Sequence, residues 1–322
     1  KKFWQTKRSV HQSYFNLTKR IFSDGLIICL FASMMVLLQL VDSFTVKNSL
    51  VSAGMLPAVA KSIKGTYDRA QPLVQLGMVV AVSFSSTLLP TLTDALQKNQ
   101  LARFRQIAKL LMRISATIAA AVTVGMIVLM PEINTLLFST PALSRTIAVY
   151  VLSVFVITLI STYNSILQSL DQFKITAVGL ILAVVVKAAI NSLMIRHFGM
   201  IGASWATVIS LLVALGIILW ALPSGVKNLF FDGKGFVHKL CLAVLMMGLS
   251  VGIVVHGLRM VIFLSRKGSI VITVIGMLVG AAVFLSMVIG QKMFTTREWL
   301  MIPGGKKLLL VLEKIAKRGN SK

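Results

Sequence analysis

The sequence predicts an all-α, polytopic membrane protein. Hydrophobic residues make up 57% of the 322 residues, charged residues make up only 13%, and the mean hydropathy is +0.87. A soluble core of this size has no room for so much apolar surface. Apolar runs of about 20 residues recur along the chain, and each can cross roughly 30 Å of hydrocarbon as a helix. These observations indicate that lipid is the solvent.

Eight apolar runs are expected to be transmembrane helices. In chain order they cover residues 24–46, 72–93, 107–130, 146–168, 175–195, 200–222, 237–258 and 269–291. The first run is too long for a cleavable signal peptide and ends without a small-residue cleavage site, so we predict that it is a span. The second run is rich in Ser and Thr, which favours contact with protein or water. An even number of spans places both termini on one side.

The net charge of +24 is explained by topology rather than by nucleic-acid binding. The basic residues lie between the hydrophobic runs and form no continuous basic and aromatic surface. Most of the 33 Lys and Arg residues fall at the two ends of the chain and in every second loop. Because cytoplasmic loops carry an excess of Lys and Arg, we expect both termini in the cytoplasm of a bacterial inner membrane. The basic segments are expected to contact anionic lipids.

Enzyme and metal signatures are absent from the sequence. There is no P-loop, no GxSxG elbow and no HExxH motif. The two cysteines, Cys29 and Cys241, both lie inside predicted spans and belong to no CxxC or Cys/His cluster. We therefore expect a membrane transporter with no cofactor, no metal and no ATP-driven step of its own.

Ionisable residues inside the spans are candidate functional groups because they are costly there. Lys187 lies in the middle of a span, and Asn191 follows one turn later on the same helix face. They could bind an anionic ligand, or the lysine could snorkel or pair with a neighbouring helix. Asp42 near the end of the first span is a candidate ion-coupling group. The alternative for Asp42 is a solvated helix end or an ion pair with nearby Lys47.

Asp68 and Arg69 open the second span and form another candidate substrate site. A guanidinium can hold two phosphate oxygens at once, so an arginine facing a membrane cavity suits a pyrophosphate-linked lipid. An ordinary interfacial arginine is the alternative interpretation.

Three stretches of the sequence resemble the MOP superfamily of multidrug and lipid-linked oligosaccharide exporters. In residues 191–207, a helix ends in a basic residue, and a short glycine turn then leads into a small-residue helix. Gly199 and Gly202 would permit this tight reversal, and small residues after them would permit close packing. Residues 39–46, and residues 68–77 with Leu88-Leu89-Pro90, resemble the SpoVB-like polysaccharide-biosynthesis branch and the MurJ-type lipid II flippases.

The resemblance implies a fold of fourteen helices, with two six-helix lobes and a final helix pair. The eight spans would then be the second lobe and that pair, and an amino-terminal lobe would be a missing partner. We expect a basic cytoplasmic linker at 1–23, a six-helix lobe at 24–222, two final spans at 223–291 and an amphipathic basic tail at 292–322.

The resemblance also implies a function. We expect a flippase that moves a lipid-linked sugar precursor, with lipid II as first choice, by alternating access. In the lipid II flippases an Asp-Arg pair places its arginine in the central cavity, and Asp68 and Arg69 match that pair. The alternatives are an exporter of another polyprenyl-linked polysaccharide unit, a cation-coupled multidrug exporter and a non-transporting scaffold.

Overall fold

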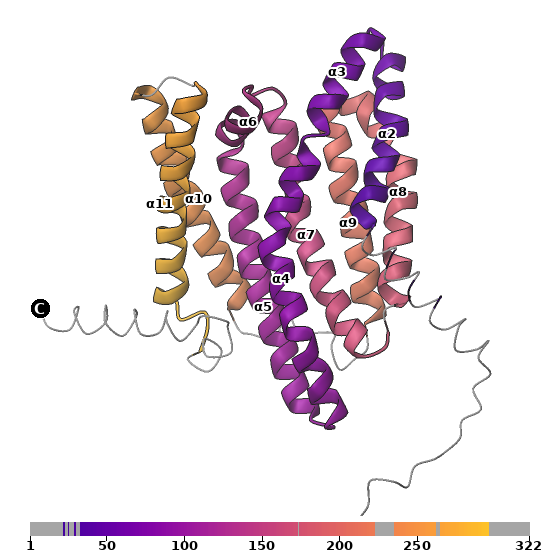
Figure 1. Cartoon of the computed structure of the whole chain (residues 1–322), viewed down its shortest axis with the longest axis vertical. Helices are drawn as coiled ribbons and strands as arrows, with labels where there is room; N and C mark the ends of the chain where they lie inside the picture. The colour runs from indigo at the N-terminus through magenta and orange to yellow at the C-terminus, as the bar shows by residue number, and fades with distance from the viewer. Residues whose placement is uncertain are drawn as a thin grey trace, which may run out of the picture.

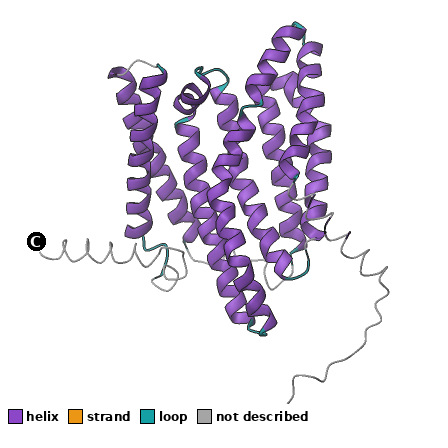
Figure 2. Cartoon of the chain, in the orientation of Figure 1, coloured by secondary structure: helices purple, strands orange, loops and turns teal. Residues whose placement is uncertain are grey.

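The structure is a computed structural model that describes residues 33–172, 174–222, 235–261 and 265–295, with three isolated positions before them. Every regular element in these ranges is an α-helix, drawn purple in Figure 2, so the all-α prediction is confirmed. The described helices are α2 (Met34–Ser52), α3 (Pro57–Tyr67), α4 (Ala70–Gln97), α5 (Leu101–Val128), α6 (Met130–Phe138), α7 (Ser144–Ser169), α8 (Lys174–Phe198), α9 (Met200–Ala221), α10 (Phe236–Val261) and α11 (Arg266–Gly290).

Seven of the helices are long and apolar enough to cross a membrane, judged on the described residues. They are α2, α5 and α7 to α11, and each overlaps one of the expected spans. The eighth expected span, 72–93, lies inside α4, whose 28 residues correspond to about 42 Å of helix. Side chains in the middle of α4 lie outside the described set. The chain is thus a multi-pass α-helical membrane protein.

Two short helices, α3 and α6, are additional to the expected elements. Pro57 and Pro131 stand in their first turns, where the fixed φ of proline suits a helix start. Ser139 follows α6 with a φ of 59°, in the left-handed conformation that commonly ends a helix. Hydropathy does not reveal these helices because neither is long enough to cross a bilayer.

Several helix ends differ from the expected span limits. Helix α2 ends at Ser52 rather than near residue 46. Helices α4 and α5 continue past the expected limits, and their hairpin projects beyond the neighbouring helices in Figure 1. An ion pair of 2.7 Å between Asp94 and Lys98, one turn apart, supports the end of α4. Helices can continue into polar sequence, whereas hydropathy marks only the apolar part.

Helix α7 is the most deeply buried candidate span among those described, and it packs against α4, α5 and α9. Helix α8 lies against α9 and α2. Helices α10 and α11 pack on each other and reach the other helices mainly through α5 and α6, at one side of the molecule in Figure 1. The core is therefore a helix bundle built around α7.

The turn between α8 and α9 confirms the predicted role of its glycines. Gly199 has φ 59° and ψ −144°, a combination that is nearly restricted to glycine. A Cβ atom on Gly202 would lie 2.0 Å from the carbonyl oxygen of Met194. Ala203 and Ala206 follow with no exposed surface, which allows α9 to pack closely on its neighbours.

The predicted division of the chain is only partly covered by the described residues. The linker 1–23, the connection 223–234 and the tail after Thr295 lie outside them, apart from Phe22. The six-helix lobe at 24–222 and the final pair at 223–291 remain predictions.

Candidate functional site

The candidate residues Asp42, Lys187 and Asn191 lie together between α2 and α8. Lys187 Nζ donates to Asp42 Oδ2 at 2.7 Å and to the carbonyl oxygen of Leu38 at 2.9 Å. Asn191 Nδ2 donates to Asp42 Oδ1 at 3.0 Å. The side chains of Lys187 and Asp42 are 0% and 2% exposed. The carboxylate therefore has both oxygens satisfied by α8, in an ion pair closed off from solvent and lipid.

Helical spacing explains how each helix supplies its half of this cluster. Leu38 and Asp42 are one turn apart on the buried face of α2, and Lys187 and Asn191 are one turn apart on the buried face of α8. Of the two interpretations of Lys187, pairing with a neighbouring helix is the one that the structure shows. The partner of Asp42 is Lys187 and not Lys47, whose side chain is exposed.

The predicted ligand roles of this cluster remain predictions. The donors of Lys187 and Asn191 point to Asp42 and its surroundings, so in this conformation they are not presented to an anionic ligand. The negative charge of Asp42 is already balanced by an ammonium group. Within the described part of the chain, no group of three or more His, Cys, Asp or Glu side chains is placed to hold a metal ion.

The second candidate pair, Asp68 and Arg69, lies at the junction of α3 and α4. Asp68 accepts from Lys64 Nζ at 2.7 Å, so its charge is balanced by α3 rather than by Arg69. The Arg69 guanidinium lies over the ring of Phe138 on α6, 4.8 Å from the ring centroid. Its Nη1 atom is buried and has no hydrogen-bond partner. This guanidinium is therefore held in place by an aromatic face while donors remain unused.

A small polar cavity joins the two candidate sites. Its volume is about 10 Å³, enough for about one water molecule. The cavity is lined by Gln39, Asp42, Tyr67, Asp68, Ala70, Gln71 and Tyr150. Residues from the first and second expected spans thus share one polar interior.

Tyr150 of α7 is a member of this site that the sequence analysis missed. Its ring packs edge-on against Tyr67, with ring centroids 5.6 Å apart. Burial raises the pKa of the Tyr67 hydroxyl well above its usual value, so that group stays neutral. No local pattern marks Tyr150, because it lies in an apolar run and meets the cavity only through the packing of α7 on α4.

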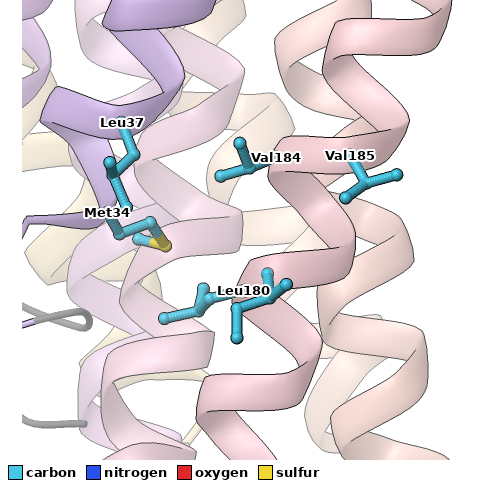
Figure 3. A pocket seen from close by; sticks show the side chains of 6 residues that line it. Met34, Leu37, Leu180, Val184 and Val185 are labelled. Atoms are coloured by element: carbon cyan, nitrogen blue, oxygen red, sulfur yellow. The ribbon is translucent and has the colours of Figure 1, made fainter. Parts of the chain in front are cut away.

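Two apolar cavities lie elsewhere on the helix bundle. One of about 470 Å³ lies between α5 and the pair α10 and α11, and apolar side chains and glycines line it, including Met126, Gly276 and Phe284. The other, of about 140 Å³, lies between α2 and α8 (Figure 3). Neither has a polar group suited to a charged ligand, so both are suited to hydrocarbon.

A further buried ion pair, also missed by the sequence analysis, connects α6 with α10. Glu132 of α6 has no exposed side-chain surface, and its Oε1 lies 2.5 Å from Nη2 of Arg259. The sequence analysis left Glu132 aside because it lies just past the expected end of the third span.

Comparison with known proteins agrees with this architecture. The model of the family described as lipid II flippase MurJ matches residues 7–276. The uncharacterized membrane protein YabM of Bacillus subtilis (strain 168) is 26% identical over 307 residues, which are 94% of this chain and 57% of that protein. The chain thus spans little more than half the length of this relative. Because the family model covers most of the described helices, the chain belongs to the lipid II flippase MurJ family.

Proposed function

We propose that this chain forms the carboxy-terminal part of a flippase that moves lipid II, a lipid-linked sugar precursor, across the bacterial inner membrane by alternating access. Family membership supports a lipid-linked substrate and a transporter rather than an enzyme. A second, amino-terminal six-helix lobe would close the central cavity. Both termini would face the cytoplasm, and their basic segments would contact anionic lipids.

The observation that carries the proposal is the unneutralised guanidinium of Arg69. The neighbouring carboxylate, Asp68, pairs with Lys64, and among the described residues Arg69 has no ion pair of its own. Phe138 holds one face of the guanidinium plane, and the buried Nη1 lacks an acceptor. A pyrophosphate supplies charge and acceptor oxygens that match a guanidinium fork. Arg69 is therefore the proposed head-group contact.

The apolar part of the cargo also has a suitable environment. The cavity of about 470 Å³ beside α10 and α11 is lined by hydrocarbon side chains and glycines. A polyprenyl chain can occupy such a surface without leaving the apolar phase. In the proposed cycle the sugar head crosses inside the cavity between the lobes, while the lipid chain stays in the bilayer.

The multidrug alternative is less well supported by the site. A cation-coupled exporter needs a carboxylate that is free to take up a cation, whereas Asp42 is already paired with Lys187. Another polyprenyl-linked glycan remains the second candidate cargo, because it would present the same pyrophosphate to Arg69.

The test is complementation of a bacterium depleted of its own lipid II flippase. The gene that encodes this chain is supplied in its native form or with Arg69→Ala, Arg69→Lys or Lys61→Ala, and membrane levels are checked by blot. Rescue is expected from the native protein and from Lys61→Ala, which removes an exposed positive charge on the neighbouring α3. Arg69→Ala is expected to fail, and Arg69→Lys to rescue only in part because lysine lacks the fork.

The possible outcomes separate the cargo from the site. Failure of a well-expressed native protein would reject lipid II and make another polyprenyl-linked glycan the leading cargo. Full rescue by Arg69→Ala would remove Arg69 from the substrate site while leaving the cargo assignment intact.

A further inference from the structure

The ammonium group of Lys187 occupies an oxygen-lined position inside the helix bundle. Its printed partners are a carboxylate oxygen of Asp42 and the carbonyl oxygen of Leu38, both on α2. Asn191 bridges from α8 to Asp42 and, at 2.6 Å, to the hydroxyl oxygen of Thr45. Carboxylate, carbonyl and hydroxyl oxygens are the ligands that hard cations prefer. The cluster therefore has the composition of a monovalent cation site in which a lysine supplies the cation.

We propose that Lys187 is a tethered counter-ion that fills the cation position beside Asp42 and fastens α2 to α8. A carboxylate enclosed in a membrane protein needs a balancing positive charge, which a proton, a metal ion or a basic side chain can supply. Here the side chain supplies it, and the pair is buried at both ends. For transport, which rests on the proposed function, the consequence is that no free cation couples at Asp42.

The surrounding packing gives this ion pair a mechanical role. On the same two helices, the cavity of about 140 Å³ opens between Met34 and Leu37 of α2 and Leu180 and Val184 of α8 (Figure 3). Met34 precedes Asp42 by about two turns, on the order of 12 Å along the helix axis. The interface between α2 and α8 is thus loosely filled on one side of the polar cluster. The ion pair is the specific connection that fixes α2 against α8 at this level.

A double-mutant cycle on the purified full chain in lipid nanodiscs tests the fastening. Asp42→Asn and Lys187→Met each leave one buried charge without its partner, and each is expected to lower the melting temperature by about 5 °C or more. The double variant removes both charges and is expected to recover most of that loss. Single variants as stable as the native chain, or a double variant no better than the worse single one, would overturn the proposal.

The cation position is tested with Na⁺ and Li⁺ as probes, against choline at equal ionic strength. The native chain is expected to melt at the same temperature in all three salts. Lys187→Ala empties the position while keeping Asp42, so Na⁺ or Li⁺ should raise its melting temperature in a concentration-dependent way. Asp42→Asn in the Lys187→Ala background should abolish this response.

Two results would contradict the tethered counter-ion. One is a Na⁺-specific stabilisation of the native chain that Asp42→Asn removes, since it would show a free cation at Asp42. The other is a Lys187→Ala variant that melts identically in all three salts. Because these measurements use no transported lipid, their failure leaves the flippase proposal standing, and failed complementation leaves them unaffected.

Discussion

At the residue scale, the closest constraint on a single side chain is at Gly202 in the first turn of α9. An added Cβ atom would lie 2.0 Å from the carbonyl oxygen of Met194 and 2.5 Å from its carbonyl carbon. These are backbone atoms of the end of α8, which cannot move aside as a flexible side chain can. Only a hydrogen atom fits there, so glycine is required for α8 and α9 to meet in this turn.

Gly202→Ala is therefore expected to cost more than about 2 kcal/mol of stability, because the clash forces the backbone of the turn apart. Gly216 on the same helix is the matched control, since its added Cβ would meet no heavy atom within 4 Å. Gly216→Ala is expected to be neutral or to stabilise by up to about 1 kcal/mol. Unfolding in detergent, followed by thermal melting, measures both. Equal losses in the two variants would contradict the role assigned to Gly202.

At the element scale, the final helix pair is attached to the bundle near the α10–α11 connection. Arg259 of α10 pairs with Glu132 of α6, and Arg266 Nε of α11 lies 3.3 Å from the carbonyl oxygen of Leu136. The two partners of the ion pair differ in burial, with 0% of Glu132 and 39% of Arg259 exposed. Removing one or the other partner should therefore have different consequences.

Arg259→Met is expected to cost about 3 kcal/mol, because it leaves a fully buried carboxylate without a partner. Glu132→Gln is expected to cost only about 1 kcal/mol, because the half-exposed arginine can turn to water. The comparison is made by thermal melting of the two variants under identical conditions. A larger loss for Glu132→Gln would show that the ion pair does not attach α10 to α6 in the way described.

At the scale of the whole molecule, the helices place successive turns at opposite ends of the bundle. The turn between α2 and α3 lies at one end in Figure 1, and the turn between α4 and α5 projects at the other. Met55 in the first turn and Gln100 in the second are both exposed. The excess of basic residues near the second turn predicts that it faces the cytoplasm.

Cysteine labelling in intact cells checks this orientation. With Cys29 and Cys241 replaced by serine, Met55→Cys is expected to react with a membrane-impermeant maleimide from outside. Gln100→Cys is expected to react only after the cells are permeabilised, which also serves as the control for reactivity. The reverse pattern would mean that both termini face away from the cytoplasm.

Much of this architecture was accessible from the sequence alone. The membrane class and the helical spans follow from the lengths of the apolar runs, and a run is a local property that packing does not change. The α8–α9 turn was also predictable, because Gly199 and Gly202 are required by local backbone geometry. The resemblance to lipid II flippases rested on short motifs and is now supported by a family match over residues 7–276.

What the sequence determined by itself was the identity of the costly residues: it marked Asp42, Arg69, Lys187 and Asn191 because polar groups in apolar runs stand out locally. Only the tertiary structure decided which of them are satisfied. It joined Asp42 to Lys187 across 145 positions and left the Nη1 of Arg69 without an acceptor. The physical reason is that hydropathy is a sum over neighbours in the chain. The pairing of buried charges instead depends on which helix faces pack together.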